Sequence, residues 1–446
     1  MMGILLAGGW WRQWDGGGDD WGYSVCVDGA NNIIVGGDSY NPGTGTIDGH
    51  IWKYDSSGNL LWDTPIPNPG NQLFRGIDTD TDNNIYVCMT DYLANKMLVV
   101  KYTSTGSFRW SFSFGPNSNA LYEVHDIWVD RDRVFAVGFE NDTVEDTITM
   151  VLHYIDTGGT LIRTVYWNGR GIFGADAFGH SVCVNSAGNP VAGGCRVDYP
   201  LPNYKAMLVE FSRTTGQEVR RVEFNPTNYW EFVEDIDVHP SGDLVFVVRV
   251  DSDPKSSYVC RYTSTFSPVW QRSISSGAIR YSLYGVDVGP GDTVLVSGLL
   301  QENGQDAEFW IRKYNWSGDS VWGTTIDHSL GYDDWSEDCA WDKTGYVIAA
   351  GGTVAGGTNK DMLVYKLPLP PVGSEESGKP CQGIQAVPNP FRTEITISGA
   401  EGPYHVYDAS GRLLFATTDK RFGGWLEPGV YFIGTKKGMI RVIKIR

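Results

Sequence analysis

The sequence is poor in charged residues, especially basic ones, and has no long hydrophobic run. Asp, Glu, Lys and Arg make up 20% of the 446 residues, with 35 Lys+Arg against 53 Asp+Glu. The net charge of −18 repels phosphate backbones and anionic lipid surfaces, so we expect no nucleic-acid partner. No stretch approaches the ~18 apolar residues that span a bilayer, and we therefore expect no membrane span.

Familiar catalytic and redox motifs are also missing. The seven cysteines form no Cys-x-x-Cys, and neither HExxH nor G-x-S-x-G occurs. The glycine pattern at 169–174 opens no helix, and the loop at 373–379 is followed by Pro380 where a P-loop needs Ser or Thr. Six cysteines lie in or beside β-like runs and are expected to be reduced core thiols, whereas Cys381 lies in a linker and should be exposed.

What the sequence has in abundance is glycine and aromatic residues. Glycine accounts for 55 positions, and aromatics reach 13%, including 17 Trp. Many glycines and aromatics with few charges indicate short strands joined by tight turns rather than helices or disorder.

An internal repeat decides the fold class. Segments 23–62 and 284–322 share one template: an apolar strand, a tight turn, a strand ending near Gly, a polar loop, a strand ending in Lys-Tyr, and a Trp after Ser-Gly. The first strand ends every 50–55 residues, seven times in all, at Asp28, Asp80, Asp130, Asn185, His239, Gly289 and Asp342. Four strands in a repeat of ~50 residues predict an all-β, seven-bladed propeller over residues 1–370.

The last repeat lacks its outermost strand. The Trp of that strand, or an Arg in its place, appears in order only six times, at Trp62, Trp110, Arg163, Arg220, Trp270 and Trp322. Residues 8–17, GGWWRQWDGG, have the same layout. We therefore predict that Trp10–Asp15 pairs with the strand 361–367 and closes the ring, with Trp11 as the buried ring.

The C-terminal end is chemically different from the repeats. A linker rich in Pro, Gly and Ser covers 371–385. Residues 386–446 carry nine Lys/Arg and five Asp/Glu, a net +4, so the rest of the chain holds −22. This tail reads as about six short strands with turns at 408–411 and 427–429, a small β-sandwich.

Two resemblances follow from these motifs. The blade template VD..GN..V.G…KYD..G…W resembles bacterial SBBP-type propeller repeats and, more loosely, NHL repeats; 55–62 also looks like the docking motif of quinone propellers.

The tail, with P-N-P-F at 388–391, V-Y-D-A-S-G-R at 406–412 and G-V-Y-F at 429–432, resembles the sorting domain of type IX secretion substrates. That resemblance implies secretion machinery as a partner, a secreted or outer-surface location, and a signal peptide. The start, MMGILLAGGWW, has no basic n-region, which suggests that the true start lies upstream.

Polar residues converge where the first strand of each blade begins. The entry positions are Tyr23, Arg75, His125, His180, Glu234, Tyr284 and Glu337, and the next positions include Asp126, Asp235 and Asp338. Carboxylates and imidazoles at such a channel mouth suit cation binding or acid–base chemistry; they also fit a solvated rim. If Glu234, Asp235, Glu337 and Asp338 meet, at least one carboxyl pKa should rise.

Aromatic residues precede the same strands and can bind a ligand or pack the blade tops. They are Trp21, Phe74, Tyr122, Phe178, Trp230, Tyr281 and Trp335, with Asp19, Asp20, Asp333 and Asp334 beside them. Asp78, Asp80, Asp82 and Asn84 alternate like half of a calcium loop, but Asn83 and Met89 occupy the Gly and Glu positions of such a loop. We therefore expect no obligatory cofactor, with calcium as the open alternative.

These features favour an exported binding or scaffold module with a glycan or protein ligand on the propeller face. Its site residues are Trp21, Arg75, His125, Asp126, His180, Glu234, Asp235, Trp335, Glu337 and Asp338. The alternative is an enzyme at the channel mouth, either a polysaccharide lyase or a quinone-dependent oxidoreductase.

Overall fold

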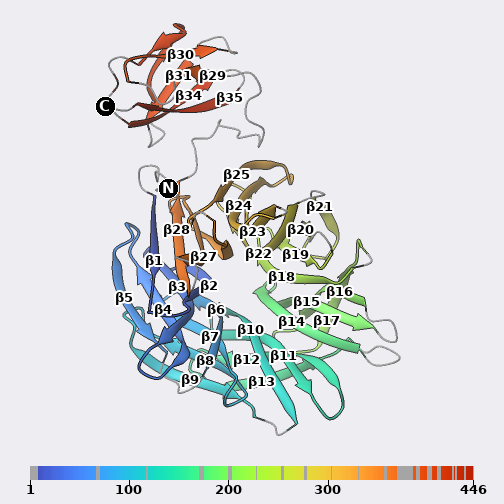
Figure 1. Ribbon diagram of the computed structural model, residues 1–446. Helices are drawn as coiled ribbons and strands as arrows, with labels where there is room; N and C mark the ends of the chain where they lie inside the picture. The colour runs from blue at the N-terminus through green and yellow to red at the C-terminus, as the bar shows by residue number, and fades with distance from the viewer. Residues whose placement is uncertain are drawn as a thin grey trace.

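The fold is that of the computed structural model shown in Figure 1. The residues that the structure describes are 9–66, 71–116, 119–169, 175–198, 203–227, 229–252, 256–275, 279–302, 304–329, 331–355, 359–368, 385–387, 392–398, 404–408, 413–423, 426, 429–435 and 438–444. No helix long and apolar enough to cross a membrane occurs among them.

Seven four-stranded antiparallel sheets form the propeller, as the repeat predicts. Blades 1 to 3 contain β2 (Trp21–Val27), β3 (Ile33–Asn41), β4 (Thr46–Tyr54) and β5 (Leu60–Pro65); β6 (Gln72–Thr79), β7 (Ile85–Asp91), β8 (Lys96–Tyr102) and β9 (Phe108–Phe114); β10 (Ala120–Asp130), β11 (Arg133–Asp142), β12 (Thr147–Asp156) and β13 (Leu161–Trp167). Blades 4 and 5 contain β14 (Ala175–Val184), β15 (Pro190–Asp198), β16 (Asn203–Phe211) and β17 (Glu218–Phe224); β18 (Glu231–Val238), β19 (Leu244–Val250), β20 (Ser256–Tyr262) and β21 (Pro268–Ile274). Blade 6 contains β22 (Ile279–Gly289), β23 (Thr293–Glu302), β24 (Ala307–Asn315) and β25 (Ser320–Ile326), and blade 7 contains β26 (Asp334–Trp341), β27 (Val347–Ala355), β28 (Asn359–Leu367) and β1 (Trp10–Trp14).

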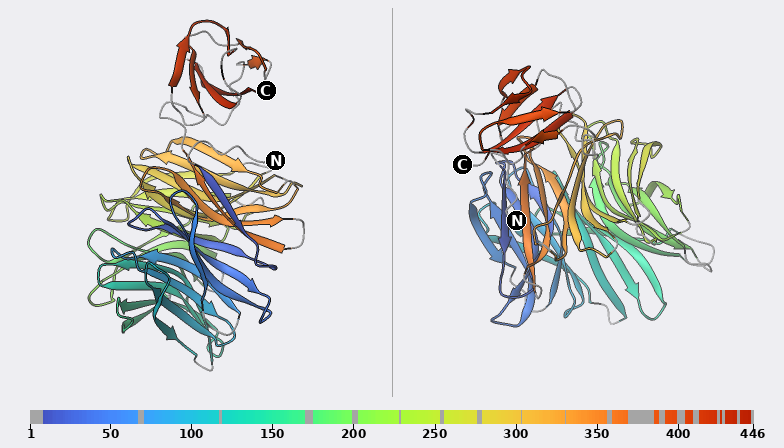
Figure 2. Two further views of the ribbon diagram at one scale, coloured as in Figure 1. Left: turned by 90° about the vertical axis from the view of Figure 1, so that its left-hand side faces the viewer. Right: turned by 45° about the horizontal axis from the view of Figure 1, so that its top comes forward.

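The first strand of the chain closes the ring. β1 pairs with β28 from Trp10↔Lys366 to Trp14↔Met362, and the two strands lie side by side in Figures 1 and 2. The predicted pairing is therefore confirmed, but the buried ring is not Trp11. Trp10 is the indole that packs into the core between blades 7 and 1, because alternation along β1 points Trp11 to the opposite face, where it is only partly buried.

Tryptophans of the outer strands contact the next blade at the same place in four blades. We call this place, a backbone carbonyl and a turn glycine of the next blade, the tryptophan seat. Four indole Nε1 groups donate to backbone carbonyls of the next blade over 3.0–3.3 Å: Trp10 to Ser56, Trp62 to Ser104, Trp110 to Thr157 and Trp270 to Trp316. Each ring lies against a turn glycine with positive φ, namely Gly58, Gly106, Gly159 and Gly318. A Cβ there would lie 2.6–3.1 Å from the indole, so the seat requires glycine.

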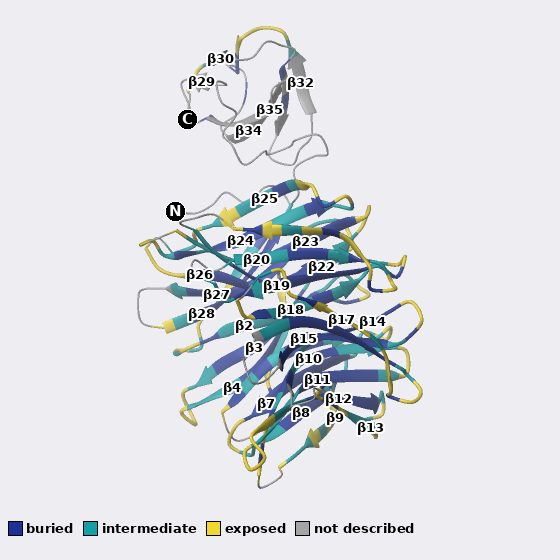
Figure 3. Ribbon diagram, turned by 90° about the vertical axis from the view of Figure 1, so that its right-hand side faces the viewer, coloured by how far each residue is buried: buried dark blue, intermediate teal, exposed yellow. Residues whose placement is uncertain are grey.

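In five blades a side chain at the end of the first strand fixes the first turn, namely that of Asp28, Asp80, Asn185, His239 and Asp342. Asp28 accepts hydrogen bonds from Ala30 N and Asn32 N, and its carboxylate forms a buried 2.8 Å ion pair with Lys53. Lys366 and Asp342 repeat the pair at 2.7 Å. The inner strands are buried and exposed residues gather at the connections (Figure 3), which places variable side chains at the two ends of the blades.

The remaining strands follow at the C-terminal end of the chain. β29 (Gln385–Val387), β30 (Ile395–Ser398) and β33 (Arg421–Phe422) form one sheet. β31 (Tyr404–Asp408), β32 (Leu413–Thr417), β34 (Gly429–Thr435) and β35 (Gly438–Lys444) form another. The predicted turn tips at 409–411 and 427–428, together with Cys381, lie outside the described residues. The other six cysteines are free thiols, five of them buried, as predicted.

Candidate functional site

Every innermost strand carries a β-bulge at the same position. The register shifts at one residue in each strand, and the bulged residues are the predicted entry positions: Tyr23, Arg75, His125, His180, Glu234, Tyr284 and Glu337. A bulge leaves one residue unpaired and redirects its side chain. We call these seven residues the mouth ring.

Blades 2 to 4 contribute the cationic and imidazole side of the mouth ring. Glu123 Oε2 lies 3.4 Å from His125 Nε2 and 3.7 Å from an Arg75 Nη. The imidazoles of His125 and His180 stack with centroids 5.1 Å apart. Burial lowers the pKa of both histidines, and Arg75 lowers that of His125 further, so the pair is neutral at pH 7.

Blades 5 to 7 contribute the carboxylate side, where the two glutamates behave differently. Burial opposes ionisation of Glu234, but Arg249, 2.6 Å away, lowers the pKa of Glu234 below its ordinary value. Burial raises the pKa of Glu337 to about 7, although Trp21 Nε1 donates to it over 3.2 Å. A raised carboxyl pKa is thus found at Glu337 and not at Glu234.

The aromatics were predicted in the connections before these strands, but all except Trp230 lie within the strands themselves. They divide between packing and exposure. Phe74, Tyr122 and Trp335 are buried, whereas Trp230 is 45% exposed. The ring of Trp21 stacks on Tyr23 and lies at an angle to Trp335. Lys360 Nζ lies over the same ring, 4.2 Å from its centroid, in a cation–π contact.

Each predicted aspartate directly follows a mouth-ring residue and hydrogen-bonds to a neighbouring blade. We call a carboxyl that links two blades in this way a latch. Asp126 Oδ2 accepts hydrogen bonds from Ser181 Oγ and Val182 N of blade 4, and Asp338 Oδ2 accepts them from Ser24 Oγ and Val25 N of blade 1. Asp235 Oδ2 likewise accepts from Val286 N of blade 6. These hydrogen bonds make all three residues latches along the channel wall, and their predicted part in ligand binding stays a prediction.

Sequence reasoning missed a second layer of latches deeper in the channel. Asp78, Asp237 and Asp287 accept backbone hydrogen bonds of 2.6–2.7 Å from the next blades, at Val129, Val288 and Trp341. The two-residue spacing within Asp235-Ile236-Asp237 was the available signal, because alternate strand residues share a face.

The six latches, which we call the channel carboxyls, surround a small polar cavity. Its volume is about 260 Å³, and Ser24, Trp128 and Ala340 also line it. Asp237 and Asp287 hydrogen-bond to each other, an arrangement that requires a proton between them. Burial raises the pKa of Asp78 and Asp126 to about 7 and that of Asp338 to about 6. Burial also raises the pKa values of Asp235, Asp237 and Asp287. At Asp235 and Asp287 the charges of neighbouring carboxyls raise the pKa further.

The residues of the calcium-like run at 78–84 have two different roles, one in the channel and one in the β6–β7 turn. Asp78 faces the channel, whereas Asp80 accepts hydrogen bonds from Asp82 N, Asn84 and Tyr86 and holds the β6–β7 turn. The run is therefore an ordinary first turn of a blade, like that of Asp28.

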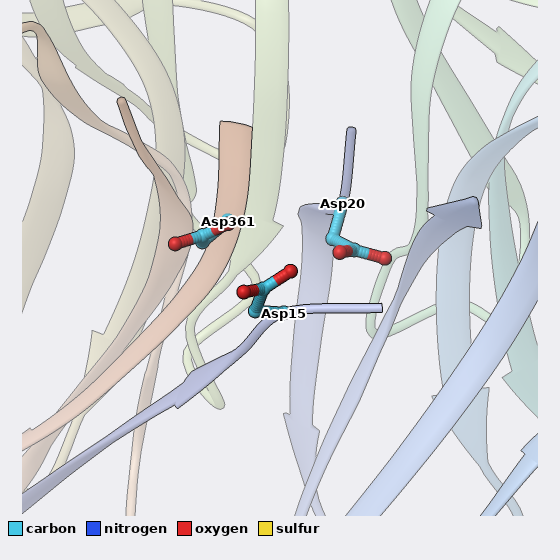
Figure 4. A group of neighbouring side chains, drawn as sticks. All are labelled: Asp15, Asp20 and Asp361. Carbon is cyan, nitrogen blue, oxygen red and sulfur yellow. The ribbon is translucent and has the colours of Figure 1, made fainter. Parts of the chain in front are cut away.

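Three further carboxylates meet at the seam of the ring. Asp15, Asp20 and Asp361 each bring an oxygen within 4.8 Å of the others, at the end of β1 and the start of β28 (Figure 4). Gly16 N and Ser39 Oγ donate to Asp20, and Gln13 Nε2 donates to Asp361, each over 2.5 Å. These hydrogen bonds tie the closing strand to blades 1 and 7.

Comparisons with known proteins place the chain among propellers without assigning it a family. No family model matches. An uncharacterized WD repeat-containing protein of Acanthamoeba polyphaga mimivirus is 30% identical over 30% of this chain, and the match spans only 11% of the viral protein. The relation to SBBP or NHL repeats and to the sorting domain therefore stays a prediction.

Solved structures show likeness at low identity. A protein of unknown function from Dyadobacter fermentans has a TM-score of 0.52 at 10% identity, covering 82% of this chain and 99% of its own. PorZ, described as an essential bacterial surface component of the type-IX secretion system of Porphyromonas gingivalis, has a TM-score of 0.33 at 13% identity, covering 94% of this chain and 68% of its own. The Dyadobacter protein supports the propeller fold, and nothing beyond the fold follows from these likenesses.

Proposed function

We propose that this propeller is a ligand-binding module whose site is the mouth ring. The supporting observation is the contrast between scaffold and ring: the bulge recurs seven times, yet it presents Tyr, Arg, His, His, Glu, Tyr and Glu. The packing positions vary less: four blades bind an outer tryptophan in the same way, at Trp10, Trp62, Trp110 and Trp270. Varied polar side chains on a uniform scaffold are what recognition of one asymmetric ligand needs.

A glycan is the ligand class that best fits the mouth. Trp230 is 45% exposed and offers an aromatic face. The mouth ring adds carboxylates, imidazoles and the guanidinium of Arg75, which bond sugar hydroxyls while an aromatic ring stacks on the sugar. The neutral imidazoles of His125 and His180 near Arg75 also favour a second candidate, a lyase-type enzyme acting on acidic polysaccharides, since a neutral base beside a cation suits proton abstraction.

A glycan array followed by calorimetry tests the proposal. We expect Arg75→Ala and Glu337→Gln to weaken binding of the best glycan at least ~10-fold, because each removes a charged or hydrogen-bonding partner. Lys343→Ala, at a turn on the opposite end of blade 7, is the matched control and should bind normally. A propeller that binds no glycan, or that binds equally in all variants, contradicts the proposal; release of unsaturated product during binding favours the lyase.

We further propose that residues 386–446 deliver the propeller to the cell surface through secretion machinery. The motifs at 388–391, 406–412 and 429–432 support this proposal. Deleting 386–446 should leave a propeller with unchanged melting temperature that fails to reach the surface, as measured by surface labelling of cells. Equal labelling with and without the tail would show that delivery does not depend on it.

A further inference from the structure

A row of aromatic rings leads away from the mouth ring across blades 3, 4 and 5. It consists of Phe139, Phe178, Tyr204, Phe232 and Trp230, which we call the aromatic row. Phe139 lies 5.5 Å from His125 of the mouth ring and 5.0 Å from Phe178, measured between ring centroids. Tyr204 continues the row, 6.1 Å from Phe178 and 4.6 Å from Trp230. Phe232 joins Tyr204, at 5.4 Å, to His180 of the mouth ring, on which it stacks at 5.9 Å.

None of the five rings is buried. Trp230 is 45% exposed, and the other four are partly exposed. Because each ring contacts the next, the row is one continuous surface that starts at the mouth ring. Contiguous exposed apolar groups of this kind mark an interaction surface rather than ordinary surface residues.

The position of Trp230 has a structural task in other blades. In blades 1, 2, 4 and 7 the residue four positions before the mouth-ring residue is Asp or Asn. Its side chain accepts a backbone N–H at the start of the third strand of the preceding blade. These four hydrogen bonds of 2.7–3.2 Å run from Lys360 to Asp19, Ile47 to Asn71, Ile148 to Asp176 and Ala307 to Asp333.

Blade 5 cannot form this bond, because tryptophan has no acceptor in its side chain. The backbone nevertheless keeps the place: Trp230 O accepts from Asp251 N over 2.8 Å, as Asp333 O accepts from Val354 N over 3.0 Å in blade 7. The indole lies against Tyr204, at the start of the third strand of blade 4. An exposed aromatic ring therefore stands where other blades have a structural residue, which indicates a task other than folding.

The connection that carries Trp230 is well fixed. Glu231, which is fully buried, accepts from Thr227 N over 2.9 Å and from Thr227 Oγ1 over 2.7 Å. Thr227 Oγ1 also accepts from Tyr229 N over 3.1 Å. The indole is thus oriented before a ligand arrives, which lowers the entropic cost of binding.

Unpaired nitrogen atoms border the row where it meets the mouth ring. Among the described side chains, His125 Nε2 and His180 Nδ1 are buried atoms without a hydrogen-bond partner. Carboxylate oxygens of Glu123 and Glu234 lie 3.4 Å and 3.7 Å from them, beyond good hydrogen-bond geometry. Such atoms favour a ligand that carries hydroxyl groups, which a purely apolar partner could not supply.

We infer that the aromatic row binds a linear glycan of several sugar units, with one end of the chain in the mouth ring and the other on Trp230. Sugar rings combine flat C–H faces, which stack on aromatic rings, with hydroxyls at their edges, which would pair with His125 and His180. The inference rests on the proposed function and adds to it the length of the ligand and its direction, across blade 4 to blade 5.

Two measurements test the inference. Affinity electrophoresis on native gels that contain xylan, laminarin, hydroxyethyl cellulose or polygalacturonate selects the polysaccharide, and calorimetry compares its disaccharide with its hexasaccharide. We expect the hexasaccharide to bind at least ~10-fold more tightly, because it extends over the aromatic row. Trp230→Ala should remove most of this difference and leave the affinity for the disaccharide unchanged. Trp230→Asp should do the same at an unchanged melting temperature, since three other blades have Asp at this position.

The matched control is Tyr332→Ala. Tyr332 is 40% exposed and precedes Asp333 in blade 7 as Tyr229 precedes Trp230 in blade 5, so the control should bind the hexasaccharide as the unmodified chain does. Equal affinity for the two sugars, or an equal effect of Trp230→Ala on both, would overturn the inference and leave the glycan site of the mouth ring intact. Retardation on none of the gels would contradict the proposed function and the inference with it. A self-associated chain in sedimentation that Trp230→Ala dissociates would place a second copy on the row and overturn the glycan.

Discussion

A chain that begins at Gly17 should melt far below the full chain, with the whole propeller unfolding rather than one end. Removing β1 leaves the edge of β28 unpaired, because the five residue pairs from Trp10↔Lys366 to Trp14↔Met362 are lost. It also empties the seat at Gly58, which holds the indole of Trp10. Because β1 joins the two ends of a long chain, its loss opens the ring instead of fraying a strand.

The size of the effect follows mostly from Trp10. This side chain is 6% exposed, and truncating a buried tryptophan costs about 3–5 kcal/mol. Arg12 adds a 2.7 Å hydrogen bond to Gly58 O, and Gln13 adds one to Asp361. We expect Trp10→Ala alone to lower the unfolding free energy by about 3 kcal/mol and Trp11→Ala by less than half of that, since Trp11 remains partly exposed.

Thermal melts and limited proteolysis check this expectation. A chain beginning at Gly9 keeps β1 and is the matched control; it should melt with the full chain. If the chain beginning at Gly17 melts at the same temperature as the one beginning at Gly9, the closing strand contributes nothing and the argument fails. Proteolysis that removes 9–16 before any other segment would contradict it as well.

The blade architecture was predictable because the same pattern of strands and turns recurs in seven repeats. A glycine turn, an aromatic residue at the end of the third strand and an outer Trp recur at one spacing in most blades, and each keeps one physical role there. The missing seventh Trp therefore pointed to β1. The face of β1 was assigned wrongly because Trp10, Trp11 and Trp14 offer indoles on both faces, and only the contacts with Tyr54 and Trp52 distinguish them.

The mouth ring was predictable for the same reason, but its chemistry was not. Alignment of the strands placed the bulged residues correctly, since the bulge keeps its position in each repeat. The pKa of Glu234 depends on Arg249, which comes from the second strand of blade 5 and follows no template position. Glu123 and the Asp237–Asp287 contact were missed likewise, because they arise from side chains that meet across elements.

The channel carboxyls, together with Glu337 and Asp38, should make the propeller less stable as the pH rises from about 4 toward 8. Burial raises the folded-state pKa of Asp78, Asp126 and Glu337 to about 7 and that of buried Asp38 to about 8. A raised folded pKa gives stability that is complete below the unfolded value and is lost as the pH passes the folded one. One unit corresponds to about 1.4 kcal/mol, and each loss runs from the unfolded pKa near 4 up to the folded pKa, so the loss from these four groups should be complete by about pH 8.

Other groups lose stability in the opposite direction, as the pH falls. Burial lowers the pKa values of His50, His125, His153 and His180, so these side chains lose stability as the pH falls below their unfolded value of 6.5. The lysine-paired Asp28 and Asp342 have pKa values below 3.8 and lose stability only in stronger acid. Between about pH 4 and pH 6.5 the histidines therefore offset part of the loss from the carboxyls, whereas above pH 6.5 only the carboxyls act.

Asp287→Asn isolates the contribution of the channel. The asparagine can accept Trp341 N through its oxygen and donate through its NH₂ to Asp237, which reproduces the protonated acid without a titrating group. We expect the variant to match the unmodified chain near pH 4, where Asp287 is protonated in the folded state and only partly ionised in the unfolded state, and to melt about 2 °C or more higher near pH 8, with Asp82→Asn at an exposed turn as the control. Melts recorded across this range decide the matter: if Asp287→Asn loses as much stability as the unmodified chain, the shared proton of Asp237 and Asp287 is not a source of the pH dependence, and the channel carboxyls act as ionised latches.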